Sequence, residues 1–173
     1  MSRVYGPDLM LELCRRSAER GYTHFLYGGA DGVAEELRAK LERRFPGLRV
    51  VGTYTPPFRP LNAGEERDLM ERVAELKPDV LWVGLSTPKQ ERFMNQYFTR
   101  LDTRVMIGVG AAFDMHSGRT KQAPRWMQRS GLEWFYRLTQ EPRRLFKRYA
   151  VNNPRFVFRM LLQSAGVVTY SID

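Results

Sequence analysis

Short apolar runs and amphipathic helical runs alternate along most of this chain, and that alternation limits the fold more than any other feature. Four apolar runs are short enough to be buried strands, at residues 23–27, 48–54, 79–84 and 104–109. A helical pattern precedes the first run and follows each of the four. Parallel strands need such crossover helices. We therefore predict an α/β fold, a Rossmann-like parallel sheet flanked by helices.

Capping and breaking residues bound the expected helices. The first helix is expected to begin with Asp8 as its N-cap and to end at Gly21. Its predicted buried face carries Leu9, Leu13 and Cys14. A later helix over residues 63–76 is expected to begin at Asn62.

Residues 79–119 carry the strongest candidate site. A buried strand opens this stretch, and a polar turn then leads to Pro88, Lys89 and Gln90. Pro88 suits the first turn of a helix, which either hydroxyl of Ser86-Thr87 can cap. Lys89 and Gln90 then lie above the C-terminal end of a strand, where open α/β sheets bind ligands.

A second strand end lies close by in the same stretch. The strand at 104–109 runs into Gly110 and Asp114, and small residues there let the backbone approach a ligand. Lys89 can neutralise a diphosphate, and Gln90 can orient the substrate. These features favour a phosphate-bearing substrate, although a solvated Lys89 is the alternative.

A glycine turn at residues 28–32 follows the first predicted strand. Gly28, Gly29 and Asp31 there resemble half of a nucleotide-binding unit in outline, but a plain tight turn is the alternative. Asp31 or Asp114 can hold a ribose hydroxyl, or Asp31 can simply stabilise its turn. The stiff loop Pro56-Pro57-Phe58 can cover a bound base or cap the core.

The remaining chemistry-bearing residues point to no metal and no cofactor. His24 lies in a predicted strand and is interpreted as structural, whereas His116 in a loop is a weaker candidate donor to a phosphate. No third ligand is spaced to complete a metal site with them. Cys14 has no cysteine partner within the chain, and it is interpreted as a small core or surface residue.

Charge is distributed unevenly along the chain, whose net charge is +9. Residues 1–115 hold 17 Lys/Arg against 16 Asp/Glu, whereas residues 116–160 hold 11 against 2. We therefore divide the chain into a Rossmann-like domain, 1–118, and a basic helical appendage, 119–173. Such asymmetry indicates an anionic partner. No nucleic-acid recognition motif is present, which favours a membrane surface.

The appendage combines aromatic and basic residues in short helical runs. These are expected at 121–129, 132–139, 143–149 and 155–163, with Asn152-Asn153-Pro154 separating the last two. The composition is typical of helices that lie in a membrane interface. The alternative is that the apolar residues pack on the sheet and the arginines are solvated. No apolar run is long enough to span a bilayer, and no export signal is seen, so a cytoplasmic location is expected.

An ordered set of motifs extends from about Arg3 to Gln163. It comprises Gly28-Gly29, Pro56-Pro57-Phe58, Pro88-Lys89-Gln90-Glu91, Gly108-Val109-Gly110-Ala111, Phe113-Asp114, Ala123-Pro124 and Gly131-Leu132-Glu133-Trp134. In this set the chain resembles the WecG/TagA/CpsF glycosyltransferase family. The resemblance implies transfer of an N-acetylmannosamine-type sugar from a UDP-sugar to a polyprenyl-diphosphate-linked acceptor. It also implies a peripheral position at the inner face of a bacterial membrane, in wall or surface-polysaccharide synthesis.

The residue patterns and the resemblance together give expected roles to individual residues. Gly28, Gly29, Asp31, Lys89, Gln90, Gly110 and Asp114 are expected to bind the donor, with Arg3 as a further cation. The membrane or lipid diphosphate is expected to contact Arg125, Arg129, Arg137, Arg144 and Arg148. The family's N-terminal part, with its proposed catalytic base, has no counterpart here, so no general base is assigned. A non-catalytic sugar-nucleotide binding module is the alternative function, and the sequence leaves open whether the chain forms an oligomer.

Overall fold

The computed structural model describes residues 5–168, without the side chains of Arg144, Lys147 and Arg148. Arg3 therefore lies outside the described residues, as do the side chains of two arginines expected at the membrane. The chain divides into two compact units, residues 1–121 and 122–173. This boundary falls close to the division predicted after Gly118. Each unit is described by itself below.

The first unit is built on a four-stranded parallel sheet. Its strands are β1 (Thr23–Gly28), β2 (Arg49–Tyr54), β3 (Val80–Gly84) and β4 (Val105–Gly108). They lie in the order β2-β1-β3-β4, and every neighbouring pair is parallel. The predicted parallel α/β fold is confirmed.

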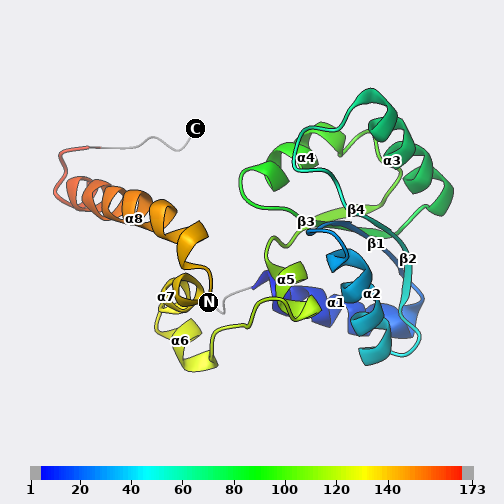
Figure 1. Ribbon diagram of the computed structural model, residues 1–173, viewed down its shortest axis with the longest axis horizontal. Helices are drawn as coiled ribbons and strands as arrows, with labels where there is room; N and C mark the ends of the chain where they lie inside the picture. The colour runs from blue at the N-terminus through cyan, green and yellow to red at the C-terminus, as the bar shows by residue number, and fades with distance from the viewer. Residues whose placement is uncertain (1–4, 169–173) are drawn as a thin grey trace. The chain divides into compact units, whose positions relative to one another are not determined.

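Helices cover both faces of this sheet (Figure 1). One face carries α1 (Gly6–Arg20), α2 (Val33–Arg44) and α5 (Ala112–Ser117), and the other carries α3 (Ala63–Leu76) and α4 (Lys89–Tyr97). Each face has its own apolar cluster, so β3 is buried on both sides: Leu81 packs with α3 and α4, while Trp82 packs with α1 and α2. Near-continuous apolar sequence is what a strand buried on both faces requires.

The start of α1 differs from the prediction. The N-cap is Tyr5 rather than Asp8, which lies in the first turn. Pro7 follows at the start of the helix, where its fixed φ is already helical and its missing N–H would have had no partner. The buried face is shifted accordingly, because Leu9 is exposed while Met10 and Cys14 are buried. The predicted end at Gly21 is confirmed, with this residue in the left-handed conformation.

Two other predicted helix starts have different outcomes. Asn62 begins α3 as predicted, and its side chain forms a capping box with Glu65. Before α4, however, Pro88 is the N-cap and no side chain caps the helix. The Thr87 hydroxyl instead donates to the Glu91 carboxylate at 3.2 Å. Lys89 and Gln90 still begin the first helical turn, as predicted.

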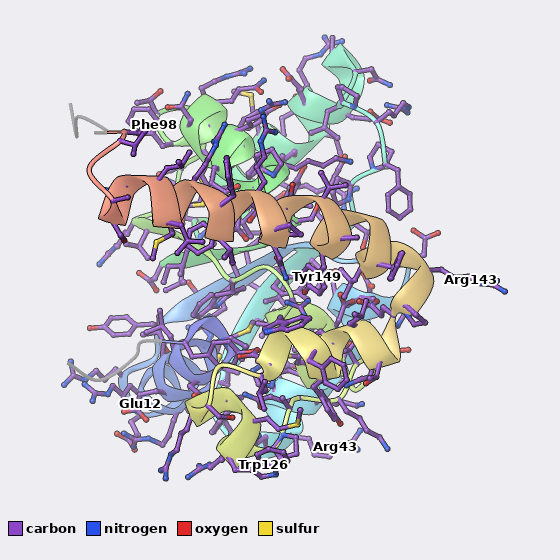
Figure 2. The ribbon with its side chains drawn as sticks, turned by 90° about the vertical axis from the view of Figure 1, so that its left-hand side faces the viewer. Glu12, Arg43, Phe98, Trp126, Arg143 and Tyr149 are labelled. Atoms are coloured by element: carbon purple, nitrogen blue, oxygen red, sulfur yellow. The ribbon has the colours of Figure 1, made fainter. Side chains whose placement is uncertain are left out.

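The second unit is helical. It contains α6 (Arg125–Arg129), α7 (Glu133–Gln140) and α8 (Pro142–Ser164). The prediction of two helices separated at Asn152-Asn153-Pro154 is wrong, because α8 runs continuously with Pro154 inside it. A proline inside a helix removes one backbone hydrogen bond and can kink the helix without ending it. Figure 2 labels Trp126 on α6 and Tyr149 on α8; the Tyr149 ring makes an edge-on contact with Trp134 at 6.0 Å.

Candidate functional site

The ends of β1 and β3 meet at the carboxyl edge of the sheet. Gly28 pairs with Gly84, and the Gly29 N–H donates to the Gly84 carbonyl at 3.1 Å. A Cβ added to Gly28 would lie 2.6 Å from that carbonyl oxygen. The strand order reverses between β1 and β3, so this edge is the topological switch point where open α/β sheets bind ligands.

Phe113 occupies part of the space that these glycines leave. A side chain on Gly84 would clash with the Phe113 ring, and a Cβ on Gly29 would lie 3.6 Å from it. The ring is fully buried. The glycine-rich strand ends therefore accommodate a core side chain from α5, in addition to bringing the backbones close together. The sequence analysis includes Phe113 in a motif but does not predict this packing; the available signal is the glycine at the strand end, which often marks the close approach of another group.

Gln90 connects the start of α4 to the end of β4. Its Oε1 accepts a hydrogen bond from the Gly110 N–H at 2.8 Å, and its amide group lies against Gly108, where an added Cβ would clash. Gly110 has a positive φ of 52°, a conformation that favours glycine. Gln90 therefore holds the turn after β4 in place. Its predicted contact with substrate stays a prediction.

Lys89 differs from the other cations near this edge. Its side chain is exposed, and it forms no ion pair within residues 5–168. Arg119 by contrast donates to the Asp31 carbonyl at 2.8 Å and lies 3.5 Å from the Glu36 carboxylate. Lys89 is thus a cation available to an anionic ligand at the start of a helix that follows β3.

The two candidate carboxylates lie in different surroundings. Asp31 is exposed in the glycine turn, with its backbone held by Arg119. Asp114 is half-buried on α5, where its carbonyl accepts from the Thr120 N–H at 3.0 Å. The α5 helix is fastened to α2 by a hydrogen bond from the Lys40 ammonium to the Ser117 carbonyl. Asp31 thus follows β1, one of the two strands at the switch point, whereas Asp114 follows β4, the strand next to β3.

The histidines are used within the fold. His116 Nε2 lies 2.9 Å from the Pro7 carbonyl and ties α5 to α1. Burial lowers the pKa of His116, and this bond partly offsets that effect. His24 is fully buried beside Trp82, in agreement with its structural interpretation. Among the described residues, no group of three or more His, Cys, Asp or Glu is placed to hold a metal ion.

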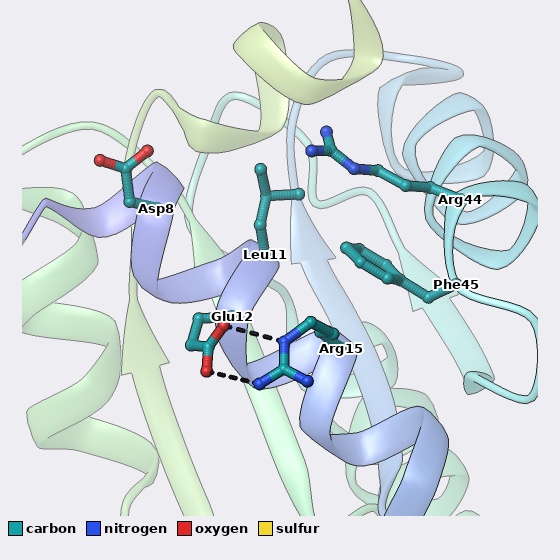
Figure 3. A pocket seen from close by; sticks show the side chains of 6 residues that line it. All are labelled: Asp8, Leu11, Glu12, Arg15, Arg44 and Phe45. Atoms are coloured by element: carbon teal, nitrogen blue, oxygen red, sulfur yellow. Dashed lines mark hydrogen bonds and ion pairs between the residues drawn. The ribbon is translucent and has the colours of Figure 1, made fainter.

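A surface pocket of about 240 Å³ lies elsewhere, between α1 and the end of α2 (Figure 3). It is lined by Asp8, Leu11, Glu12, Arg15, Arg44 and Phe45. Hydrogen bonds from Arg15 and Arg16 lower the pKa of Glu12 to about 2, so the carboxylate and its cations already satisfy one another. None of the predicted substrate-binding residues lines this pocket, and we do not assign it to the site.

Comparison with known proteins agrees with the site's motifs. The model of the glycosyl transferase WecG/TagA/CpsF family matches residues 1–168. The chain belongs to this family. It is 31% identical over 170 residues to an N-acetylglucosaminyldiphosphoundecaprenol N-acetyl-beta-D-mannosaminyltransferase of Bacillus subtilis (strain 168), a match covering 98% of this chain and 63% of that protein.

A second relative gives a similar result. The chain is 32% identical over 160 residues to the protein of the same description from Bacillus spizizenii (strain ATCC 23059 / NRRL B-14472 / W23). That match covers 92% of this chain and 60% of the relative. The chain therefore spans less than two thirds of the length of the curated relatives it matches.

The arginines predicted to contact the membrane lie in the second unit of this family member. Arg125 and Arg129 are exposed on α6, whereas Arg137 on α7 is partly buried with its Nε lacking a hydrogen-bond partner in the described structure. α8 exposes large apolar side chains over most of its length, namely Phe146, Val151, Phe156, Val157, Phe158, Met160 and Leu161. No helix within residues 5–168 is both long and apolar enough to cross a membrane.

Proposed function

We propose that this chain binds a UDP-sugar at the carboxyl edge of its sheet and serves in sugar transfer to a polyprenyl-diphosphate-linked acceptor. One observation carries the donor site: Lys89, exposed and without an ion pair in the described structure, begins α4, the helix that follows β3 and its Gly84, which pairs with Gly28. A diphosphate there would face a cation and the positive end of a helix dipole. The relatives are described as N-acetylmannosaminyltransferases, which supports this type of donor sugar.

The reaction proposed is displacement at the anomeric carbon. The acceptor hydroxyl forms a new bond to that carbon, the bond to UDP breaks, and UDP leaves with the bonding electrons. Charge develops on the diphosphate, and Lys89 stabilises it electrostatically. Gln90 fixes the Gly110 turn and so positions the backbone around the donor. The proton of the acceptor hydroxyl needs a base, and we assign none among these residues.

Replacing Lys89 with Ala should weaken UDP binding by about 10- to 100-fold, the scale of a charge-assisted hydrogen bond. Calorimetric titration with UDP measures this effect. Arg67→Ala is the charge control, because Arg67 is exposed within α3 and its removal changes the net charge equally. Equal affinities for the two variants, or no UDP binding by the folded wild type at about millimolar concentration, would contradict the donor site.

We further propose that the second unit holds the protein on anionic membranes at the cytoplasmic face. The exposed aromatic and apolar side chains of α8 can insert among lipid headgroups while nearby arginines contact phosphates. This role and the polyprenyl-linked acceptor support one another, because such an acceptor resides in a bilayer.

Replacing Arg125 and Arg129 together with Gln should weaken binding to anionic vesicles roughly thirty-fold, since each arginine near such a surface contributes about 1 kcal/mol. Flotation with vesicles containing phosphatidylglycerol measures the partition, which should also fall with added salt. The control is the double replacement of exposed Arg67 and Arg92 in the first unit. Identical flotation on neutral vesicles would argue against the electrostatic contribution.

A further inference from the structure

The outer edge of β4 has backbone groups without partners in the part of the chain that the structure describes. β4 pairs with β3 through the N–H groups of Val105, which donates to Asp79 at 3.1 Å, and Val109, which donates to Val83 at 3.0 Å. Because backbone groups of successive strand residues point alternately to opposite sides, those of Met106 and Gly108 point away from β3. Within residues 5–168 these outward groups have no hydrogen-bond partner.

The side chains of β4 are also incompletely covered on both faces of the sheet. Met106 packs at the margin of the α3–α4 cluster and Ile107 at the margin of the α1–α2 cluster, and neither is fully buried. Val105 is 45% exposed, whereas Leu81 and Trp82 on the neighbouring strand are 0% exposed. The β4 edge is therefore apolar on both faces, as an interior strand would be.

The opposite edge of the sheet, β2, is protected in the way that natural edge strands usually are. Its register shifts opposite His24 and Phe25, the mark of a bulge. The Val50 N–H donates to the Glu42 carboxylate at 3.4 Å. Bulges and charged side chains prevent unwanted strand pairing. Residues 105–110 have no charge and no proline, so the β4 edge lacks these protections.

The topology shows from which direction a neighbour of β4 would come. The connection from β1 through α2 leads toward the β2 side of the sheet, and α2 lies on the same face as α1. The connections through α3 and α4 lead toward the β4 side and lie on the other face. Because both the direction and the face are reversed, all three connections have the same hand. Crossovers between parallel strands are right-handed almost without exception. A crossover through α1 into β1 must then start from a strand on the β4 side.

The beginning of α1 lies where such a strand would end. A Cβ added to Gly6 would lie 3.5 Å from the Val109 carbonyl oxygen, directly after β4. A strand running parallel to β4 in the next position along the sheet would finish at this carboxyl edge and could lead straight into α1. The location of the start of α1 and the hand of the crossover therefore indicate the same position for the additional strand, outside β4.

We propose that β4 accepts a fifth parallel strand, contributed by the polypeptide that precedes α1 in longer members of the family. The curated relatives have more than a third of their length outside the match, and the sequence resemblance places that part ahead of Arg3. This strand would form hydrogen bonds with the outward backbone groups of Met106 and Gly108. It would also cover the apolar side chains at the margins of both clusters. The proposal does not depend on the donor site, and its test measures pairing rather than catalysis.

Amide hydrogen exchange tests the proposal directly. In the 173-residue chain, Met106 and Gly108 should exchange at least about 100-fold faster than Ile107, which faces β3. Fusing the preceding part of the Bacillus subtilis relative ahead of Met1 should slow both outward amides by a similar factor. Unchanged exchange in the fusion would overturn the proposal. So would slow exchange in the unfused chain that depends on protein concentration, because a second copy would then occupy the edge.

A proline variant separates strand pairing from side-chain packing. Met106→Pro removes the outward N–H, and Met106→Ala removes the side chain but keeps that N–H. The two variants should have similar Tm values in the unfused chain, whereas proline should lower the Tm several degrees further in the fusion. If the fusion does not fold, the same pair of substitutions at the matching position of the intact Bacillus subtilis relative provides the comparison. Equal Tm values for the pair there would overturn the proposal.

Discussion

The 173-residue chain assayed alone should transfer N-acetylmannosamine from its UDP derivative at least about 10²-fold more slowly than the full-length Bacillus subtilis relative, the lower range of what a positioned general base contributes. The chain spans 63% of that relative, and the resemblance places the proposed base in the part that is not spanned. The donor-side residues are present, so binding of UDP should survive while turnover is low.

A radiolabelled donor and a short-chain lipid-diphosphate-N-acetylglucosamine acceptor measure this difference. Turnover equal to that of the relative would show that a base exists within these residues, and Asp31→Asn and Asp114→Asn would then identify it. With low turnover, the fusion that carries the relative's preceding part should restore transfer. UDP binding without restored transfer would instead favour the sugar-nucleotide binding module as the function.

The architecture of the first unit could be predicted from sequence because each element is specified locally. Apolar runs in β1 and β3 are short and bounded by glycine, and the Asn62 capping box fixes the start of α3 within a single turn. Helix ends near prolines could be predicted less well. Pro88 is an N-cap and Pro154 lies within α8, because the cost of a proline depends on which backbone bonds its neighbours keep.

The site could be predicted only in part, because a glycine in the sequence does not identify the residue that packs against it. The sequence correctly indicates glycines where β1 and β4 end. It does not indicate that Phe113 packs against Gly84 or that Gln90 binds the Gly110 N–H, since both are contacts between distant elements. The open edge of β4 is likewise visible only after the strand order and its hydrogen bonds are known.

His24 is another residue whose role depends on a distant contact. Its Nδ1 accepts a hydrogen bond from the Trp82 indole N–H at 2.7 Å, and both side chains are 0% exposed. The neutral ring therefore carries its proton on Nε2, which has no partner within the described structure. Protonating Nδ1 would break the bond to Trp82 and place a charge in the core. Burial accordingly lowers the pKa of His24 from 6.5 to about 4, although Asp79 opposes the shift.

This shift predicts that acid destabilises the protein before its carboxylates titrate. The unfolded chain binds a proton at His24 below its ordinary pKa of 6.5, whereas the folded chain binds one only near 4, so stability falls as the pH decreases through this interval. Between about pH 7 and about pH 4.5 the loss should be about 2–3 kcal/mol of unfolding free energy. Urea unfolding followed by circular dichroism at several pH values measures it.

His24→Gln should remove this dependence, because a neutral amide oxygen can still accept from Trp82 and has no proton to gain in this range. The variant can be less stable than wild type at neutral pH, but its stability should fall less steeply toward about pH 4.5, and part of the remaining loss should come from His116. His116→Gln is the comparison, because burial also lowers the pKa of His116 and this residue should therefore add its own, separate part of the acid sensitivity, which the bond to Pro7 partly offsets. A His24→Gln variant that loses stability as steeply as wild type would show that other groups carry the acid sensitivity. The buried pair of His24 and Trp82 would then have no part in it.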